Sequence, residues 1–117
     1  MEKFSVTLPL TGEYLTTVRL TTGGLCALAE FDVEATEDFK VCVTESLLIL
    51  KRNGFATANI QFEIGESLAC VIEGVEESGE KEDGFEDEIS RALLSALLGT
   101  VDFVEVNGRV EKIVFEG

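Results

Sequence analysis

The most constraining feature of the sequence is a strict alternation of polar and apolar residues between positions 57 and 64. Apolar residues occupy the even positions from Ala58 to Ile64, and polar residues occupy the odd positions from Thr57 to Glu63. A period of two is typical of a β-strand with one buried face. Gly65-Glu66 then predicts a turn into a second strand, so the chain contains a hairpin whose apolar face another layer must cover.

Two helices are predicted ahead of this hairpin, over residues 13–30 and 34–53. In the first, apolar residues recur every three to four positions. The pair Gly23-Gly24 in its middle favours either a bend or a close approach by another backbone, because glycine weakens a helix. In the second, acidic residues crowd the first turns and basic residues close the last, the order that the helix dipole prefers. Asn53-Gly54 then predicts a left-handed stop.

The remaining elements follow from the same patterns. Alternation predicts strands over 3–8, 101–106 and 110–115, the last two joined at Asn107-Gly108, a strong hairpin signal. A third helix is predicted over 85–98. The residues expected to face inward from it are Phe85, Ile89, Leu93, Ala96 and Leu97.

The element order is therefore βααββαββ, and the expected fold is an α/β (α+β) two-layer sandwich. We expect a mixed, mostly antiparallel sheet of about five strands with three helices on one face. No repeat, linker or low-complexity segment interrupts the sequence, so residues 1–117 are predicted to form a single domain.

The net charge of −14, from 23 acidic against 9 basic residues, argues against functions that need clustered Lys and Arg. Nucleic acid and anionic membranes are therefore not expected as partners, whereas basic proteins are permitted. The charge is concentrated in residues 73–88, which hold nine acidic residues and one lysine. From about 74 to 84 we predict a mobile acidic loop, which is either solvated or docks a basic protein.

The sequence has no histidine, the usual metal ligand and neutral-pH base, and no metal site is expected. Cys26, Cys42 and Cys70 lie among apolar residues without a CxxC spacing, which favours buried, reduced thiols over a reactive thiol. The first residues already alternate like a strand, not like a signal peptide. No apolar run reaches the roughly 18 to 20 residues that span a bilayer. A cytoplasmic location is therefore expected.

Two stretches carry a resemblance to a known family. They are Tyr14–Leu20 in the first predicted helix and Glu37–Ser46 in the second, which reads Glu-Asp-Phe-Lys-Val-Cys-Val-Thr-Glu-Ser. Together with the element order, they resemble the Bergerat-type ATPase fold of gyrase and histidine kinases. The closer likeness is to the anti-sigma-factor serine kinases of bacterial partner-switching systems, which open their Asn-box helix with a similar pattern.

The resemblance implies where an ATP site would lie. The glutamate that acts on the attacking hydroxyl in the kinases corresponds to Glu45. The asparagine that holds Mg²⁺ one helical turn later corresponds to Ile49, whose hydrocarbon side chain cannot coordinate this cation. Glu45 is therefore interpreted either as a vestigial base or as a partly exposed helix glutamate.

The other nucleotide motifs of the family are altered as well. The Asp-x-Gly-x-Gly motif, whose aspartate binds adenine, falls at Glu73 and Gly74, with the aspartate position at Gly74. We interpret both as degenerate adenine-side positions, with a surface role as the alternative for Glu73. The phosphate-binding glycine turn falls at about residues 88–91, next to the acidic residues 86–88, which repel a polyphosphate. No cofactor is expected, and ATP with Mg²⁺ enters only if the pocket is divergent and active.

Two further groups are candidates for binding. Val41, Leu48 and Ile49 form a second apolar set that faces the nucleotide pocket in an ATP-binding relative; a filled core is expected there, with an apolar ligand site as the alternative. The resemblance also implies that Arg19 and Tyr14 contact a protein partner, although Arg19 equally fits a solvent-facing position.

These observations leave three hypotheses for the function. The first is a non-catalytic protein-binding regulatory module that resembles an anti-sigma-factor kinase domain without ATP binding. Its partner is then a sigma factor or its antagonist, and a homodimer through the edge of the first strand is a further expectation. The second is an active ATP-dependent serine/threonine kinase with a divergent pocket, and the third is a structural or accessory domain.

Overall fold

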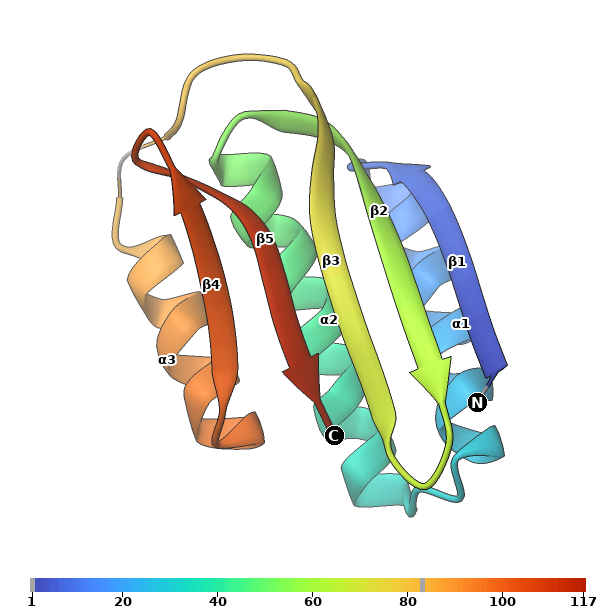
Figure 1. Ribbon diagram of the computed structural model, residues 1–117. Coiled ribbons are helices and arrows are strands. Elements are labelled where there is room, and N and C mark those ends of the chain that lie inside the picture. Colours follow the sequence, from blue (N-terminus) through green and yellow to red (C-terminus); the bar gives the residue numbers. More distant parts are fainter. Residues whose placement is uncertain (1, 83) are drawn as a thin grey trace.

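The computed structural model describes residues 2–82 and 84–117, and the described chain has the predicted order βααββαββ (Figure 1). Its strands are β1 (Glu2–Pro9), β2 (Phe55–Ile64), β3 (Leu68–Glu77), β4 (Val101–Val106) and β5 (Arg109–Glu116). Its helices are α1 (Gly12–Leu28), α2 (Val33–Arg52) and α3 (Glu86–Leu98). The local signals therefore located every one of these elements to within a few residues.

The strands form one sheet in the order β1-β2-β3-β5-β4. All four pairings of these strands are antiparallel, so the parallel pair implied by a mixed sheet is not found among the described residues. The three helices cover one face of the sheet, with α2 between α1 and α3 (Figure 1). The predicted two-layer sandwich is confirmed.

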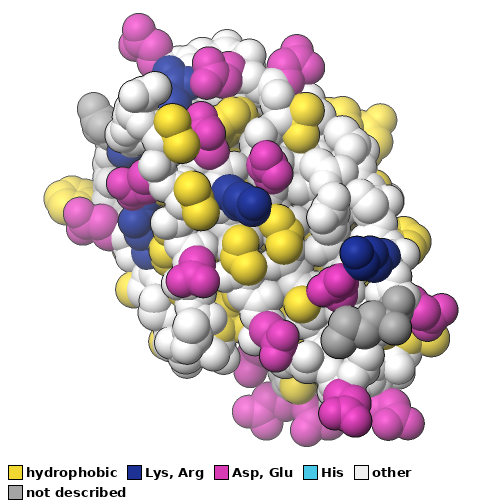
Figure 2. Space-filling view, in the orientation of Figure 1, with side chains coloured by type: hydrophobic (Ala, Val, Ile, Leu, Met, Phe, Trp, Pro, Cys, Tyr) yellow, Lys and Arg dark blue, Asp and Glu magenta, His cyan; other side chains and the backbone are white. Residues whose placement is uncertain are grey.

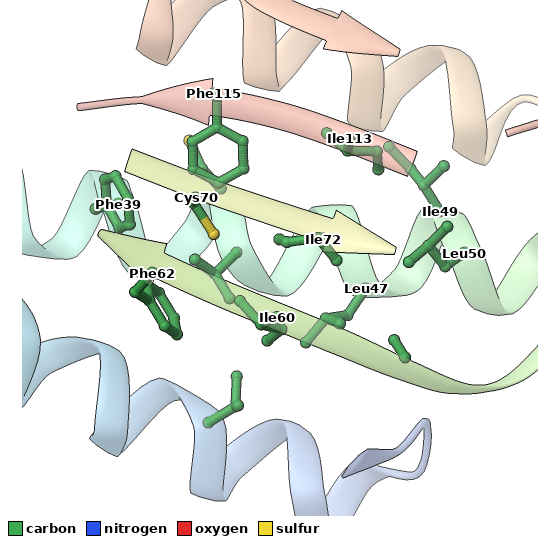
Figure 3. Close-up of a cluster of buried hydrophobic side chains, with 14 of the residues drawn as sticks. Phe39, Leu47, Ile49, Leu50, Ile60, Phe62, Cys70, Ile72, Ile113 and Phe115 are labelled. Atoms are coloured by element: carbon green, nitrogen blue, oxygen red, sulfur yellow. The ribbon is translucent and has the colours of Figure 1, made fainter. Parts of the chain in front are cut away.

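The core lies between the helices and the sheet. The strand register aligns Val6, Ile60, Ile72 and Ile113 across four strands, and the last three are fully buried. From α2, Phe39 packs edge-on against Phe115, with ring centroids 5.3 Å apart. Figure 3 shows the side chains of α2 and the strands meeting in this layer. The buried side chains of the strands thus face the buried side chains of α2. This is the arrangement that the strand period of two and the helix period of about 3.6 predict.

Helix α2 begins and ends where its sequence signals lie. The side chain of Asp32 accepts a hydrogen bond of 2.7 Å from the backbone N–H of Ala35, which caps the first turn. Gly54 follows the helix with a φ of +93°, a conformation that favours glycine. Helix α1 continues unbroken through its glycine pair. A Cβ atom at Gly23 would come within 2.8 Å of Cε of Lys40, so a side chain of α2 and not its backbone makes the close approach.

The acidic segment differs from the expectation. Strand β3 continues to Glu77, so residues 74–77 belong to the sheet and the connecting loop starts at Ser78. The described part of this loop is hydrogen-bonded to other elements: the N–H of Ser78 donates to the carbonyl of Gly54 over 2.6 Å, and that of Glu82 donates to Arg52 over 2.7 Å. The end of β3 could not be recognised in the sequence, because its acidic side chains point to solvent and leave no alternating apolar pattern.

The predicted inward face of α3 is wrong at Phe85, Ile89 and Ala96, which are exposed, whereas Leu93 is half-buried and Leu97 packs against the core. The buried residues of this helix are Ser90 and Leu94, whereas Phe85 before its first turn is 78% exposed and Ile89 is 65% exposed. The helix is turned so that the side of Asp87 and Ser90 meets α2, where both side chains make hydrogen bonds. On this same side Leu94 is fully buried and Leu97 and Leu98 pack against the core, so apolar packing and polar contacts together set the rotation of α3.

The three cysteines are buried, as predicted, and all three are free thiols. Burial, together with the carboxylates of Asp38 and Glu45, raises the pKa of Cys42 to about 12. Burial also raises the pKa of Cys26 and of Cys70. No helix within the described ranges is long and apolar enough to cross a membrane.

These pKa shifts predict a loss of stability in alkaline solution. Thiols in the unfolded chain ionise near pH 9, while the folded state holds them protonated to higher pH. For Cys42, the stabilising contribution of the protonated thiol is thus complete below pH 9 and is lost as the pH rises toward 12, by about 1.4 kcal/mol per pH unit. Urea unfolding between pH 8 and 11 measures the slope. The Cys42→Ala variant should show a shallower slope than the wild type; equal slopes would contradict the assignment.

Candidate functional site

A polar cluster joins α2 to α3 at the place where the resemblance puts the phosphates. Nη1 of Arg52 donates to Oδ1 of Asp87 over 2.8 Å and to Oγ of Ser90 over 3.2 Å. Oγ of Ser90 in turn donates to Oε2 of Glu45 over 2.7 Å. The Arg52 and Asp87 side chains are only 19% and 16% exposed, so this ion pair is largely shielded from solvent.

Asn53, at the end of α2, extends the cluster to the sheet. Its amide nitrogen donates to the carbonyl of Ile49 over 2.7 Å and to Oδ2 of Asp87 over 2.9 Å. Its amide oxygen accepts a hydrogen bond of 3.0 Å from the backbone N–H of Val110 in β5. One fully buried side chain therefore joins α2, α3 and β5. In the sequence this residue signals only a helix stop, so its connecting role went unpredicted.

The candidate base Glu45 is a member of this cluster. One of its carboxylate oxygens accepts the hydroxyl of Ser90 from α3, so the side chain is half-buried in a helix–helix contact. Ile49, at the position of the metal-binding asparagine, is fully buried. The expected filled core is confirmed at Ile49, while Val41 and Leu48 are only half-buried. At these positions Glu45 joins two helices and the side chain of Ile49 has no exposed surface.

The two candidate adenine-side residues lie on opposite faces of β3, because side chains alternate along a strand. Glu73 is exposed on the uncovered face of the sheet, beside Lys112 of β5 in the register. Gly74 faces the helices and is covered by Phe55: a Cβ atom at Gly74 would lie 2.5 Å from Cγ of that ring. The structure therefore does not bring Glu73 and Gly74 together, and an aromatic ring of the same chain occupies the space beside Gly74.

The start of α3 is acidic, and the side chain of Arg52 there is paired with Asp87. A shallow depression there is lined by Arg52, Glu82, Gly84, Glu86 and Asp87. Arg52 bonds to Asp87, so the remaining carboxylates of this surface have no cation within the depression to offset them. The negative charges of these carboxylates repel the negative charges of a polyphosphate. Among the residues that the structure describes, no group of three or more acidic or cysteine side chains is placed to hold a metal ion.

The two predicted partner-contact residues lie elsewhere. Arg19 and Tyr14 are both exposed on α1, which α2 separates from α3 (Figure 1). Glu45 bonds to Ser90 on the α3 side of α2, and among the described residues no hydrogen bond or ion pair joins it to Arg19 or Tyr14. Helix α1 also exposes Leu20 and Leu28, by 73% and 66%. The sequence did not reveal these exposed leucines, because the apolar residues of this helix were expected to be buried.

The uncovered face of the sheet is mixed in character. Figure 2 shows hydrophobic and acidic side chains over this face with few basic ones between them. Val71 and Val114 pair across β3 and β5 near its centre and are half-buried, next to the pair of Glu73 and Lys112. Within the part of the chain that the structure describes, this face shows no cluster of basic side chains that would suit a polyanion.

No protein-family model matches the chain, and no curated protein matches it in sequence. The resemblance to anti-sigma-factor kinases accordingly rests on the element order and on the residues quoted for it.

Proposed function

We propose that this chain is a non-catalytic protein-binding regulatory module, acting in the cytoplasm, in which the positions of an ATP site serve the fold instead. The observation that carries the proposal is the bond from Ser90 to Glu45, which ties the candidate base to α3. The burial of Ile49 and the ring of Phe55 over Gly74 support the same conclusion. The carboxylate oxygen that a base would offer to a substrate hydroxyl already accepts the hydroxyl of Ser90 in this arrangement.

Exposed apolar side chains on the helices support the binding role. Leu20 and Leu28 on α1, and Ile89 on α3, are each at least 65% exposed. Single exposed apolar residues are common, but groups of them on one helix mark interaction surfaces. By resemblance, the partner is a sigma factor or its antagonist, and Arg19 and Tyr14 on α1 are its proposed contacts. The proposal includes a homodimer through β1, which has an unpaired edge in the sheet of this chain.

The first test is a calorimetric titration of the chain with ATP in the presence of Mg²⁺. We expect no saturable heat up to about 1 mM nucleotide, because the phosphate end is acidic and Gly74 is covered. An affinity near 1 mM corresponds to only about 4 kcal/mol, so even weak binding is within reach of the measurement.

The Glu45→Gln variant is the matched control for this titration. It keeps the shape of the side chain and an acceptor for Ser90 but removes the charge of the base. Saturable binding of Mg-ATP by the wild type, altered in the variant, would establish a working pocket and defeat the proposal. We expect the titrations of the wild type and of the variant to give the same heats, without saturation.

A further inference from the structure

Helix α3 and the residue before it carry an unpartnered apolar face. It consists of Phe85, Ile89, Leu93 and Ala96, spaced by four, four and three residues, which places them along one side of a helix. Phe85 is 78% exposed, Ile89 is 65% exposed, Ala96 is exposed and Leu93 is half-buried. We call these four residues the α3 face. Eleven residues of helix correspond to about 16 Å, the length of three turns of a partner helix.

The exposure of this face follows from the way in which α3 is held. Its opposite side carries Asp87 and Ser90, which are fixed to α2 by hydrogen bonds of 2.7 to 3.2 Å. Turning Phe85 and Ile89 inward would break these contacts and leave Arg52 half-buried without its carboxylate. Leu94 on this opposite side is fully buried, so the polar cluster and this apolar contact together hold Phe85 and Ile89 outward.

Apolar residues of α2 lie next to this contact. Val41 and Leu48 are each one helical turn from Glu45, the residue that bonds to Ser90 of α3. Both are half-buried, so part of each side chain remains accessible. The apolar surface therefore includes the solvent side of the α2–α3 contact as well as α3 itself.

The charges around the α3 face are distributed unevenly. Glu86 and Glu88 flank its first turn and Glu82 precedes it in the loop, and all three are exposed. The basic residues beside them are Lys81, which is exposed, and Arg91, which is paired with Glu105, so an excess of negative charge remains at this end. The segment from Ala92 to Thr100 contains no charged residue. A ligand that matches this surface is apolar along its length and positively charged at one end.

We infer that the α3 face binds an amphipathic helix of a partner protein that carries basic residues at its C-terminal end. Helices dock on apolar surfaces through residues spaced by three and four, as in this face. Basic residues stabilise the C-terminal turn of their own helix, and antiparallel docking places them over Glu82, Glu86 and Glu88. A second copy of the chain fits less well, because its α3 has no basic residue in its last turn and each copy carries −14.

The probe for this inference is a fluorescein-labelled helical peptide of 16 residues, with leucines at spacings of four, four and three and with lysines at its C-terminal end. Fluorescence anisotropy at 50 mM salt measures its affinity for the full chain. We expect saturable binding that weakens at least tenfold in the Phe85→Ser/Ile89→Ser variant. Binding should also weaken at 300 mM salt, because exposed charges are screened. Serine at position 85 is a favourable N-cap, so α3 is retained.

The matched control is the Val33→Ser/Val75→Ser variant, which removes two exposed apolar side chains outside α1 and α3 and should leave the affinity within twofold of the wild type. Equal weakening by both variants, or equal binding of a peptide with glutamates in place of the lysines, would overturn the inference. So would binding to neutral lipid vesicles in place of the peptide. A dimer in sedimentation that the Phe85→Ser/Ile89→Ser variant abolishes would assign the face to a second copy.

This inference deepens the proposed function, on which it rests for the role of the chain as a protein-binding module. The two fail separately. Mg-ATP binding defeats the proposed function whatever the peptide does. Loss of discrimination between the two serine variants defeats the inference about α3 while the surface of α1 remains available to a partner.

Discussion

Replacing Asn53 by alanine should lower the free energy of unfolding by about 3 kcal/mol or more, since a buried donor or acceptor left without a partner costs about 1 to 3 kcal/mol. The variant removes three hydrogen bonds made by one fully buried side chain. It leaves the N–H of Val110 without an acceptor inside the core, and it takes one of the donors from Asp87. Equilibrium unfolding in urea, followed by circular dichroism, measures the change.

Asn59 provides the comparison. Its amide nitrogen donates to Oγ1 of Thr7 over 2.8 Å, but the residue lies on the uncovered face of the sheet and is only half-buried. Water replaces these bonds, so Asn59→Ala should cost less than about 1 kcal/mol. Similar losses in the two variants would show that the links to α3 and β5 contribute little. We expect the loss of unfolding free energy in Asn53→Ala to be more than twice the loss in Asn59→Ala.

The parts of the fold that local patterns determine were predictable from the sequence. The bounds of α2 follow from the cap at Asp32, the charge order along the helix and the stop at Gly54, all of which act within a few residues. The hairpin of β4 and β5 follows in the same way from Asn107, whose φ is +53°. Each of these signals is contained in the segment that it shapes.

The rotation of α3 was not predictable in this way. It depends on the burial of Leu94 and on the bonds of Asp87 to Arg52 and Asn53 and of Ser90 to Glu45, between residues that are 34 to 45 positions apart. Periodicity alone assigned the apolar side of α3 to the core, because it cannot register a polar partner on another helix. The same limit applied to Glu45: the sequence placed it on α2 but gave no sign of the serine that bonds to it.

Gly74 illustrates how an alignment and a structure assign different meanings to one residue. The resemblance interprets it as an adenine-binding position without its aspartate. The structure gives the glycine a packing role, because the ring of Phe55 lies where a side chain at position 74 would begin. Phe55 is itself buried and sits next to the left-handed Gly54, so the local chain path fixes the ring over the strand.

The Gly74→Asp variant decides between these meanings. If an empty adenine pocket remained, the aspartate would be accommodated and would favour nucleotide binding. With the ring at 2.5 Å from the new Cβ atom, overpacking alone should cost about 1 to 3 kcal/mol. Enclosing a carboxylate without a donor adds to this, so we expect a total of about 3 kcal/mol or more and no gain of Mg-ATP affinity. Urea unfolding measures the first quantity and calorimetry the second.

Gly79→Asp introduces the same side chain in the exposed loop, where a Cβ atom meets nothing within 4 Å, and it should change stability by less than about 0.5 kcal/mol. The cause of the difference can then be assigned to one contact. Phe55→Ala removes the ring, so the double variant with Gly74→Asp should be more stable than the sum of the single losses predicts, by about 1 kcal/mol or more. If the two losses were strictly additive, the ring of Phe55 would not limit the side chain at position 74. The covering of Gly74 by this ring would then no longer explain a loss of ATP binding.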